Sequence, residues 1–174
     1  MAVVNCVIDF GVADAIENHG SPMPLPELAA VLRCEPSCLY RIMRFLVHYL
    51  VFTEEPISQH STGFSLTPLS RRLIKHGEKT MAPFILLEAS PTMLGPWHSL
   101  SARVLESGDM PPFEAANGTA LWSYAEANPG LRKLFNDAMA CSARGTVRAV
   151  IEVCPEVFGG IESLVMLVEA TGLL

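Results

Sequence analysis

The sequence predicts a mainly α-helical fold that carries one small β-hairpin. Apolar residues recur at steps of three and four through most of the chain, which is the period of one helix face. Between residues 51 and 67 the pattern changes to two short β-type segments around a polar loop, as in a hairpin. Residues 128–155 then form one uninterrupted helical pattern, about 37 Å long at about 1.5 Å per residue.

The first fifty residues predict three helices. Residues 2–18 share one apolar stripe, and Gly20 ends that helix. A short helix follows at residues 26–32, after a turn at residues 21–24. A third helix is expected at residues 37–49. Its inward face is Leu39, Ile42, Met43, Leu46 and Val47, and its outward face is Arg41, Arg44 and His48.

The hairpin comes directly after these helices. Its predicted strands are residues 51–55 and 63–67, joined by the polar loop 56–62. Three helices followed by a hairpin is the order of a winged helix. A further helix is predicted from Thr67 to Ile74.

The middle of the chain predicts more helices. Residues 80–106 are helical in parts, with breaks near residues 90–91 and 95–96. Residues 111–114 suggest a loop, and residues 119–127 a short helix.

The long helix then begins with Asn128 as N-cap and Pro129 at its first position, where a missing N–H costs nothing. Pro155 ends it.

The last segment predicts the start of a second domain. Residues 163–168 are an apolar run of strand length, typical of a buried parallel strand. Such a strand needs neighbours on both edges, and the sequence stops six residues later. We therefore expect one domain over residues 1–156 and the remnant of another over residues 157–174.

Charge, cysteine content and hydropathy limit the classes of protein to which this chain can belong. A net charge of −6 argues against nucleic-acid binding, although Arg33, Arg41 and Arg44 would suit DNA reading by a winged helix. Five cysteines, an odd number, and an N-terminus without a basic region predict free thiols in a reducing compartment, so we expect a cytoplasmic protein. No run approaches 18 apolar residues, which predicts no membrane span.

No chemical site follows from spacing alone. Cys34 and Cys38 have no second pair at zinc spacing, so no metal site is expected. We find no glycine-rich phosphate loop and no Ser, His and Asp arrangement. An aromatic and methionine set suits either a core or a pocket for a flat apolar ligand; its members are Phe84, Trp97, Phe113, Trp122, Phe135 and Met139.

Several strings resemble those of plant small-molecule O-methyltransferases. They are residues 11–20 (GVADAIENHG), 39–46 (LYRIMRFL), 65–70 (SLTPLS), 96–100 (PWHSL) and 135–139 (FNDAM). The resemblance covers nearly the whole chain in order. It implies that residues 1–156 are a winged-helix-like dimerisation and acceptor-lid domain including a long linker helix. Residues 157–174 would be the remnant of a Rossmann-like domain that binds S-adenosylmethionine.

The family resemblance also implies roles for residues. These enzymes transfer a methyl group from S-adenosylmethionine to a phenolic hydroxyl. Leu87, Trp97, Phe135 and Met139 match acceptor-pocket positions, so they are expected to bind the phenolic substrate. Ser142 stands near the boundary of cofactor and acceptor, where relatives often carry an acidic residue or a histidine, and it is a candidate cofactor contact.

The sequence departs from the family pattern at three places. The helix that relatives use in dimer contacts would precede Met1. Residues 166–172 (MLVEATG) replace the family's glycine-rich cofactor loop and keep only Thr171 and Gly172 of it. The catalytic histidine would lie beyond Leu174, so no catalytic residue is assigned. We expect no methyl transfer and no S-adenosylmethionine binding by this chain by itself.

Two other interpretations stay open. The chain is alternatively a non-catalytic interaction module that forms homodimers, or heterodimers with a full-length relative. A DNA-binding winged helix is the least favoured.

Overall fold

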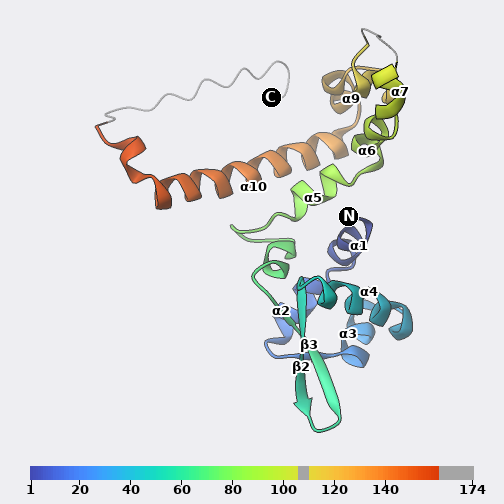
Figure 1. Cartoon of the computed structure of the whole chain (residues 1–174), viewed down its shortest axis with the longest axis vertical. Coiled ribbons are helices and arrows are strands. Elements are labelled where there is room, and N and C mark those ends of the chain that lie inside the picture. Colours follow the sequence, from blue (N-terminus) through green and yellow to red (C-terminus); the bar gives the residue numbers. More distant parts are fainter. Residues whose placement is uncertain (106–109, 161–174) are drawn as a thin grey trace. The chain divides into compact units, whose positions relative to one another are not determined.

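The computed structural model describes residues 1–105 and 110–160, which are mainly helical and include a three-stranded antiparallel sheet (Figure 1). The chain divides into two compact units, unit 1 (residues 1–86) and unit 2 (residues 87–174). The predicted strand at residues 163–168 and the loop at residues 166–172 lie outside the described residues. The predicted boundary at residue 157 therefore stays a prediction.

Unit 1 begins with two helices where the sequence predicts one. Helix α1 spans Ala2–Phe10 and helix α2 spans Val12–His19. Gly11 separates them with φ of 72°, a left-handed conformation that glycine adopts without steric cost. Its N–H donates to the Ile8 carbonyl oxygen and ends α1. The single helix over residues 2–18 is therefore wrong, because periodicity continues across the break and does not reveal it.

The other two helices of unit 1 match their predictions. Helix α3 spans Leu25–Leu32 and helix α4 spans Pro36–His48. The Glu35 carboxylate caps α4 by accepting the Ser37 N–H at 3.3 Å. The two faces of α4 are as predicted: Leu39, Met43 and Leu46 are buried, whereas Arg41, Arg44 and His48 are exposed.

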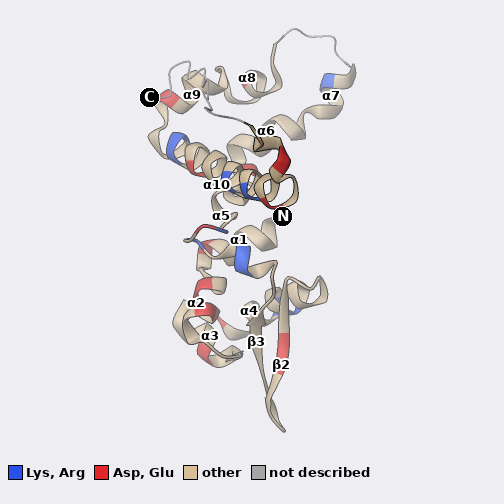
Figure 2. Ribbon diagram, turned by 90° about the vertical axis from the view of Figure 1, so that its left-hand side faces the viewer, with Lys and Arg blue, Asp and Glu red and all other residues tan. Residues whose placement is uncertain are grey.

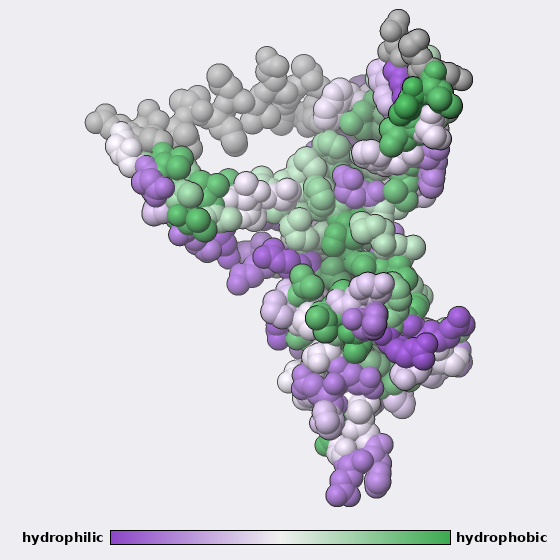
Figure 3. Space-filling model, in the orientation of Figure 1, coloured by the Kyte–Doolittle hydropathy of each residue, from purple (hydrophilic) through white to green (hydrophobic). Residues whose placement is uncertain are grey.

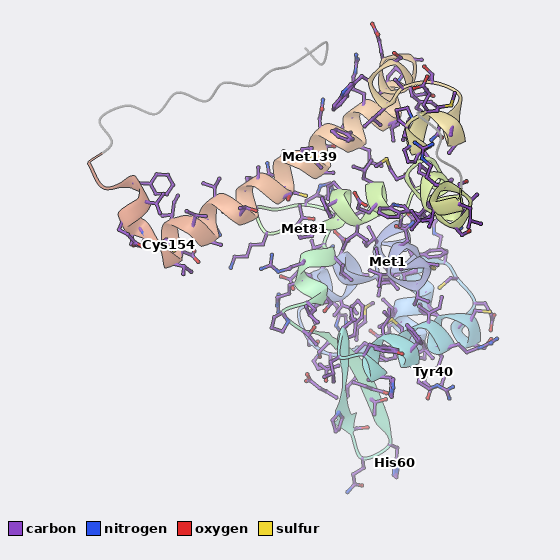
Figure 4. All side chains as sticks on the ribbon, turned by 45° about the horizontal axis from the view of Figure 1, so that its top comes forward. Met1, Tyr40, His60, Met81, Met139 and Cys154 are labelled. Atoms are coloured by element: carbon purple, nitrogen blue, oxygen red, sulfur yellow. The ribbon has the colours of Figure 1, made fainter. Side chains whose placement is uncertain are left out.

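The predicted hairpin is confirmed, with longer strands. Strand β2 (Phe52–Ser58) pairs with β3 (Ser61–Leu66), and Pro56 lies opposite Thr62, so the predicted loop 56–62 is wrong. Figure 4 shows His60 at the tip of the hairpin, and Figure 2 shows the acidic residues on β2.

A third strand, β1 (Met23–Pro24), was predicted as a turn. It pairs with β3 and completes the sheet order β1-β3-β2. Pro24 lies opposite Gly63, and a Cβ placed on Gly63 would be 2.8 Å from the Pro22 carbonyl carbon. Only glycine permits this approach of two backbones.

The core of unit 1 gathers residues from every helix and from the sheet. The largest fully buried side chains in it are Ile8, Leu28, Met43, Leu46, Phe52 and Phe64. The helix predicted over residues 67–74 is only the 3₁₀ helix η1 (Ser70–Leu73). Buried Ser70 accepts the Thr67 N–H at 2.8 Å, and the Thr67 hydroxyl donates to the Val51 carbonyl oxygen at 2.6 Å.

Three helices follow in residues 82–105: α5 (Ala82–Glu88), which crosses the boundary between the two units, α6 (Pro91–His98) and α7 (Leu100–Leu105). The break near residues 90–91 is confirmed, and the Ser90 hydroxyl caps α6 by accepting the Met93 N–H. The break at residues 95–96 is wrong, since Gly95 and Pro96 lie inside α6 and the chain turns at Ser99.

Unit 2 continues with α8 (Pro112–Asn117), α9 (Leu121–Ala127), α10 (Pro129–Val153) and the 3₁₀ helix η2 (Pro155–Phe158). The predicted loop at residues 111–114 is instead the start of α8. The long helix is confirmed as α10, 25 residues, with Met139 midway along it and Cys154 at its C-terminal end (Figure 4). The Asn128 side chain does not cap it; its Nδ2 donates to the Tyr124 carbonyl oxygen at 2.8 Å.

Burial differs between the two units. Among the described residues of unit 2, the buried hydrophobic side chains are Leu87, Ala125, Ala138 and Cys141. The C-terminal half of α10 exposes Val147, Ile151 and Val153, and Figure 3 shows hydrophobic surface at this end of the helix. Unit 2 therefore has little core of its own within the described residues. None of the helices in residues 1–105 and 110–160 has both the length and the apolar character needed to cross a bilayer.

Candidate functional site

Three of the predicted site residues lie along one stripe of α10. Phe135, Met139 and Ser142 follow one another at steps of four and three, so they share a helix face. The buried residues Ala138 and Cys141 form the neighbouring stripe, about 100° around the helix axis. Phe135 and Ser142 are half-buried, and Met139 is 40% exposed. The stripe borders the buried face of α10 and remains accessible to a ligand.

Trp122 joins this stripe from α9. Its ring meets the ring of Phe135 edge to face, with centroids 5.5 Å apart and planes at 77°. The sequence places Trp122 in the aromatic set but does not pair it with Phe135. The contact depends on how the turn at Asn128 folds α9 against α10, and the Asn128 side chain holds that turn.

A second aromatic pair joins α8 to α9. Phe113 of α8 and Tyr124 of α9 meet edge to face, with centroids 5.8 Å apart. Asn117, at the end of α8, donates through Nδ2 to the carbonyl oxygens of Thr92 at 3.2 Å and Phe113 at 3.1 Å. This amide ties α8 to α6, so helices α6, α8 and α9 are fixed by specific contacts.

The remaining two predicted residues differ in exposure. Trp97 on α6 is 64% exposed, and its ring contacts no other aromatic ring among the described residues. Leu87, near the end of α5, is fully buried. The structure thus brings Phe135, Met139 and Ser142 together on α10, but it shows no ring contact between Trp97 and Phe135.

The site offers apolar and aromatic surface with few polar groups. The Ser142 hydroxyl makes no hydrogen bond within the described part of the chain, so it is available to a ligand. Among the described residues of unit 2, His98 is the one histidine, and its side chain is exposed. Nowhere in residues 1–105 and 110–160 do three His, Cys, Asp or Glu side chains gather to hold a metal ion. These residues suit the binding of a flat ring and supply no acid–base pair.

Unit 1 carries a separate open groove that spacing did not predict. It has a volume of about 750 Å³ and lies between α1 and α4. Val3, Ile42 and Phe45 supply its apolar surface, Arg41 and Arg44 supply its cationic groups, and His48 also lines it. The exposed face of α4 was the only signal of it in the sequence.

The chain is similar to known proteins, in part to a family model and along nearly its whole length to curated relatives. Residues 1–76 match the family "O-methyltransferase dimerisation domain". The chain is 43% identical to an acetylserotonin O-methyltransferase of Arabidopsis thaliana over 180 aligned positions, which cover 99% of this chain and 47% of that protein. It is 37% identical to a trans-resveratrol di-O-methyltransferase of Vitis vinifera, over 97% of this chain and 48% of that protein. The chain spans about half the length of the curated relatives it matches.

Solved structures share the fold. Human N-acetylserotonin methyltransferase in complex with SAM superposes with a TM-score of 0.73 at 17% identity, covering 87% of this chain and 44% of that one. The pyocyanin biosynthetic protein PhzM superposes with a TM-score of 0.72 at 24% identity, covering 87% of this chain and 43% of that one.

Proposed function

Because residues 1–76 match the O-methyltransferase dimerisation domain and the chain is 43% identical to a plant O-methyltransferase, we propose that it is the dimerisation and acceptor-pocket half of a plant O-methyltransferase. The complete enzyme would transfer a methyl group from S-adenosylmethionine to a phenolic hydroxyl. The observation that carries this proposal is the 43% identity to acetylserotonin O-methyltransferase along 99% of the chain.

A winged-helix assignment for unit 1 belongs to the same proposal. The element order α1, α2, β1, α3, α4, β2, β3 and the three-stranded sheet support it. The winged-helix part would hold two protomers together, and α10 would be the linker helix. Residues 1–156 and 157–174 would then be the two domains.

The acceptor wall would be the stripe of α10. Phe135 and Met139 offer an aromatic edge and a polarisable thioether, both of which pack well on a phenolic ring. The Trp122 ring meets the Phe135 ring edge to face and would hold it in place. Trp97 is also proposed as part of this wall, and its large exposed ring supports that role. Leu87 would shape the wall from within, since its side chain is buried.

Ser142 is the proposed cofactor-side contact. It lies one turn from Met139, and its hydroxyl has no partner among the described residues. S-adenosylmethionine is the cofactor of the complete family. We propose that this chain by itself does not bind it, because the segment at residues 166–172 keeps only Gly172 of the glycines that close backbone approach to a ligand requires.

Light scattering tests the dimerisation half of the proposal. At micromolar concentration we expect twice the mass of the 18.9 kDa chain. A monomer, both alone and with the Arabidopsis relative present, would overturn it. Mixed dimers without any ligand binding would favour the alternative of a non-catalytic interaction module. Exposed Phe10, Phe45 and Leu50 on unit 1 are the observation behind that alternative.

Calorimetry tests the acceptor half. We expect heat of binding with N-acetylserotonin as the probe and none with S-adenosylmethionine. Phe135→Ala should weaken acceptor binding, whereas Val147→Ala, at an exposed position five residues beyond Ser142, should not. Equal affinity of the two variants would refute the role of Phe135.

The free thiols of all five cysteines support the proposed cytoplasmic location.

A further inference from the structure

The groove between α1 and α4 differs in charge from the rest of the chain. The protein carries a net charge of −6. The groove is nevertheless lined by the basic residues Arg41, Arg44 and His48, and no acidic residue lines it. Arg41 and Arg44 make no ion pair with any residue that the structure describes. The groove thus presents unneutralised positive charge beside apolar surface.

The apolar part of the groove is also unpartnered. Phe45 is 46% exposed, and its ring meets that of Tyr49, itself 60% exposed, with centroids 4.7 Å apart. Val3 of α1 and Ile42 of α4 flank it and are half-buried. Figure 4 shows α1 from Met1 and α4 at Tyr40, the two helices that border the groove. Large apolar side chains left open beside cations are typical of a surface that another molecule covers.

The spacing of the lining residues fits a helix as occupant. Arg41, Phe45 and His48 recur at steps of four and three, so they form a single ridge along α4. A helix laid beside this ridge would meet the apolar surface with its own i, i+3, i+4 and i+7 residues. Carboxylates flanking that stripe would meet the arginines, which bind carboxylates in a planar, two-pronged geometry.

We therefore infer that the α1–α4 groove docks an amphipathic helix with an acidic rim from another protein. A second copy docked groove on groove fits less well, because that two-fold pairing would bring two sets of cations together. Duplex DNA fits less well, because Val3, Ile42 and Phe45 offer nothing to phosphates. A flat anionic bilayer cannot enter a concave groove.

A fluorescent peptide of about 15 residues tests the inference. It carries leucines at helical i, i+3, i+4 and i+7 positions with glutamates on both sides, and a matched peptide carries lysines instead. Fluorescence polarisation with the full chain should show binding of the acidic peptide, weakening as salt rises. The lysine peptide should not bind.

Variants locate the binding. Arg41→Glu with Arg44→Glu should weaken the acidic peptide at least about tenfold, because two attractions become repulsions. Phe45→Ala should weaken it without changing the salt dependence. Arg72→Glu is the matched control, since Arg72 is exposed on unit 1 and lies outside the groove. Circular dichroism of each variant confirms that it is folded.

Four results would overturn the inference. Equal peptide affinity of the wild-type chain and the folded double variant would remove the groove from the interaction. Dissociation of a dimer into monomers by the double variant would make the groove a seat for a second copy. Salt-sensitive binding of a duplex of about 20 base pairs, lost in the double variant, would make it a nucleic-acid site. Binding to phosphatidylserine vesicles, lost in the same way, would make it a membrane site.

Discussion

The rings of Trp122 and Phe135 meet edge to face, 5.5 Å between centroids, and this contact joins α9 to α10 at the proposed acceptor wall. Edge-to-face pairs contribute about 0.5–1.5 kcal/mol beyond the burial of their surface.

A double-mutant cycle of Trp122→Leu and Phe135→Leu should therefore give a coupling free energy near the lower end of that range, about 0.5 kcal/mol, since Trp122 is 46% exposed. Urea unfolding of the four proteins measures it. Tyr124→Leu paired with Phe135→Leu is the control, because the Tyr124 ring meets Phe113 edge to face instead. Strictly additive effects of Trp122 and Phe135 would contradict the contact.

Gly63 should not tolerate a side chain. In Gly63→Ala the new Cβ would lie 2.6 Å from the Ile57 side chain and 2.8 Å from the Pro22 backbone. Ile57 can rotate away, but the backbone of Pro22 must shift and separate β1 from β3. We expect a loss of about 1–3 kcal/mol, typical of overpacking, seen as a lower Tm. Gly130→Ala, with no atom within 4 Å of the new Cβ, is the control. An unchanged Tm for Gly63→Ala would mean that β1 does not pair with β3 in solution.

Two other glycines should respond in opposite directions. Gly11→Ala places a side chain at φ of 72°, which costs about 1–2 kcal/mol for a residue other than glycine. Gly145→Ala lies inside α10 with open space around it, so it should stabilise the helix by about 0.5–1 kcal/mol. Thermal unfolding followed by circular dichroism compares the two. If both variants lowered the Tm equally, α10 would not be helical at Gly145.

The Cys6 thiol should titrate at higher pH than an ordinary thiol. Burial raises its pKa most, and the negative charge of Asp9 and the neighbouring Cys34 raise it further. The folded chain then binds more protons than the unfolded chain above the ordinary thiol pKa, so stability falls as pH rises through this range.

Alkylation by iodoacetamide, followed residue by residue with mass spectrometry, measures the effect. The pH midpoint for Cys6 should drop in Asp9→Asn, which removes one of the raising charges. Glu55→Gln, whose carboxylate is not among the causes of the shift, should leave the midpoint where it is. An unchanged pH midpoint for Cys6 in Asp9→Asn would rule out a contribution of the Asp9 charge to the Cys6 pKa.

Local patterns in the sequence predict most of the fold, and contacts between distant residues account for the errors. The 25-residue α10 and the two faces of α4 follow from apolar spacing, which each helix carries within itself. Strand β1 is only two residues long and exists because it pairs with β3, forty residues away. Periodicity cannot reveal such a strand. Gly11 breaks a helix whose apolar stripe continues across the break, so only its backbone conformation reveals it.

The candidate site is predicted less completely than the fold. Phe135 and Met139 can be placed on one stripe from their spacing of four. The pairing of Phe135 with Trp122 could not be predicted, because it depends on the turn between α9 and α10, where Asn128 bonds back to Tyr124 instead of capping the next helix. The groove on unit 1 was missed for a similar reason, since it needs α1 beside α4.

The uneven burial of the two units has a consequence for how readily each part of the chain opens locally to solvent. Unit 1 encloses large side chains such as Phe52, Phe64 and Met43, whereas the described part of unit 2 encloses mainly small ones such as Ala125 and Ala138. Backbone amides in a region with few buried apolar contacts open to solvent at lower free energy than those around a large core. The amides of α9 and α10 should therefore exchange with deuterium well before those of α4 and β3. In the proposed enzyme half, that difference would leave the proposed acceptor wall adaptable while unit 1 stays rigid.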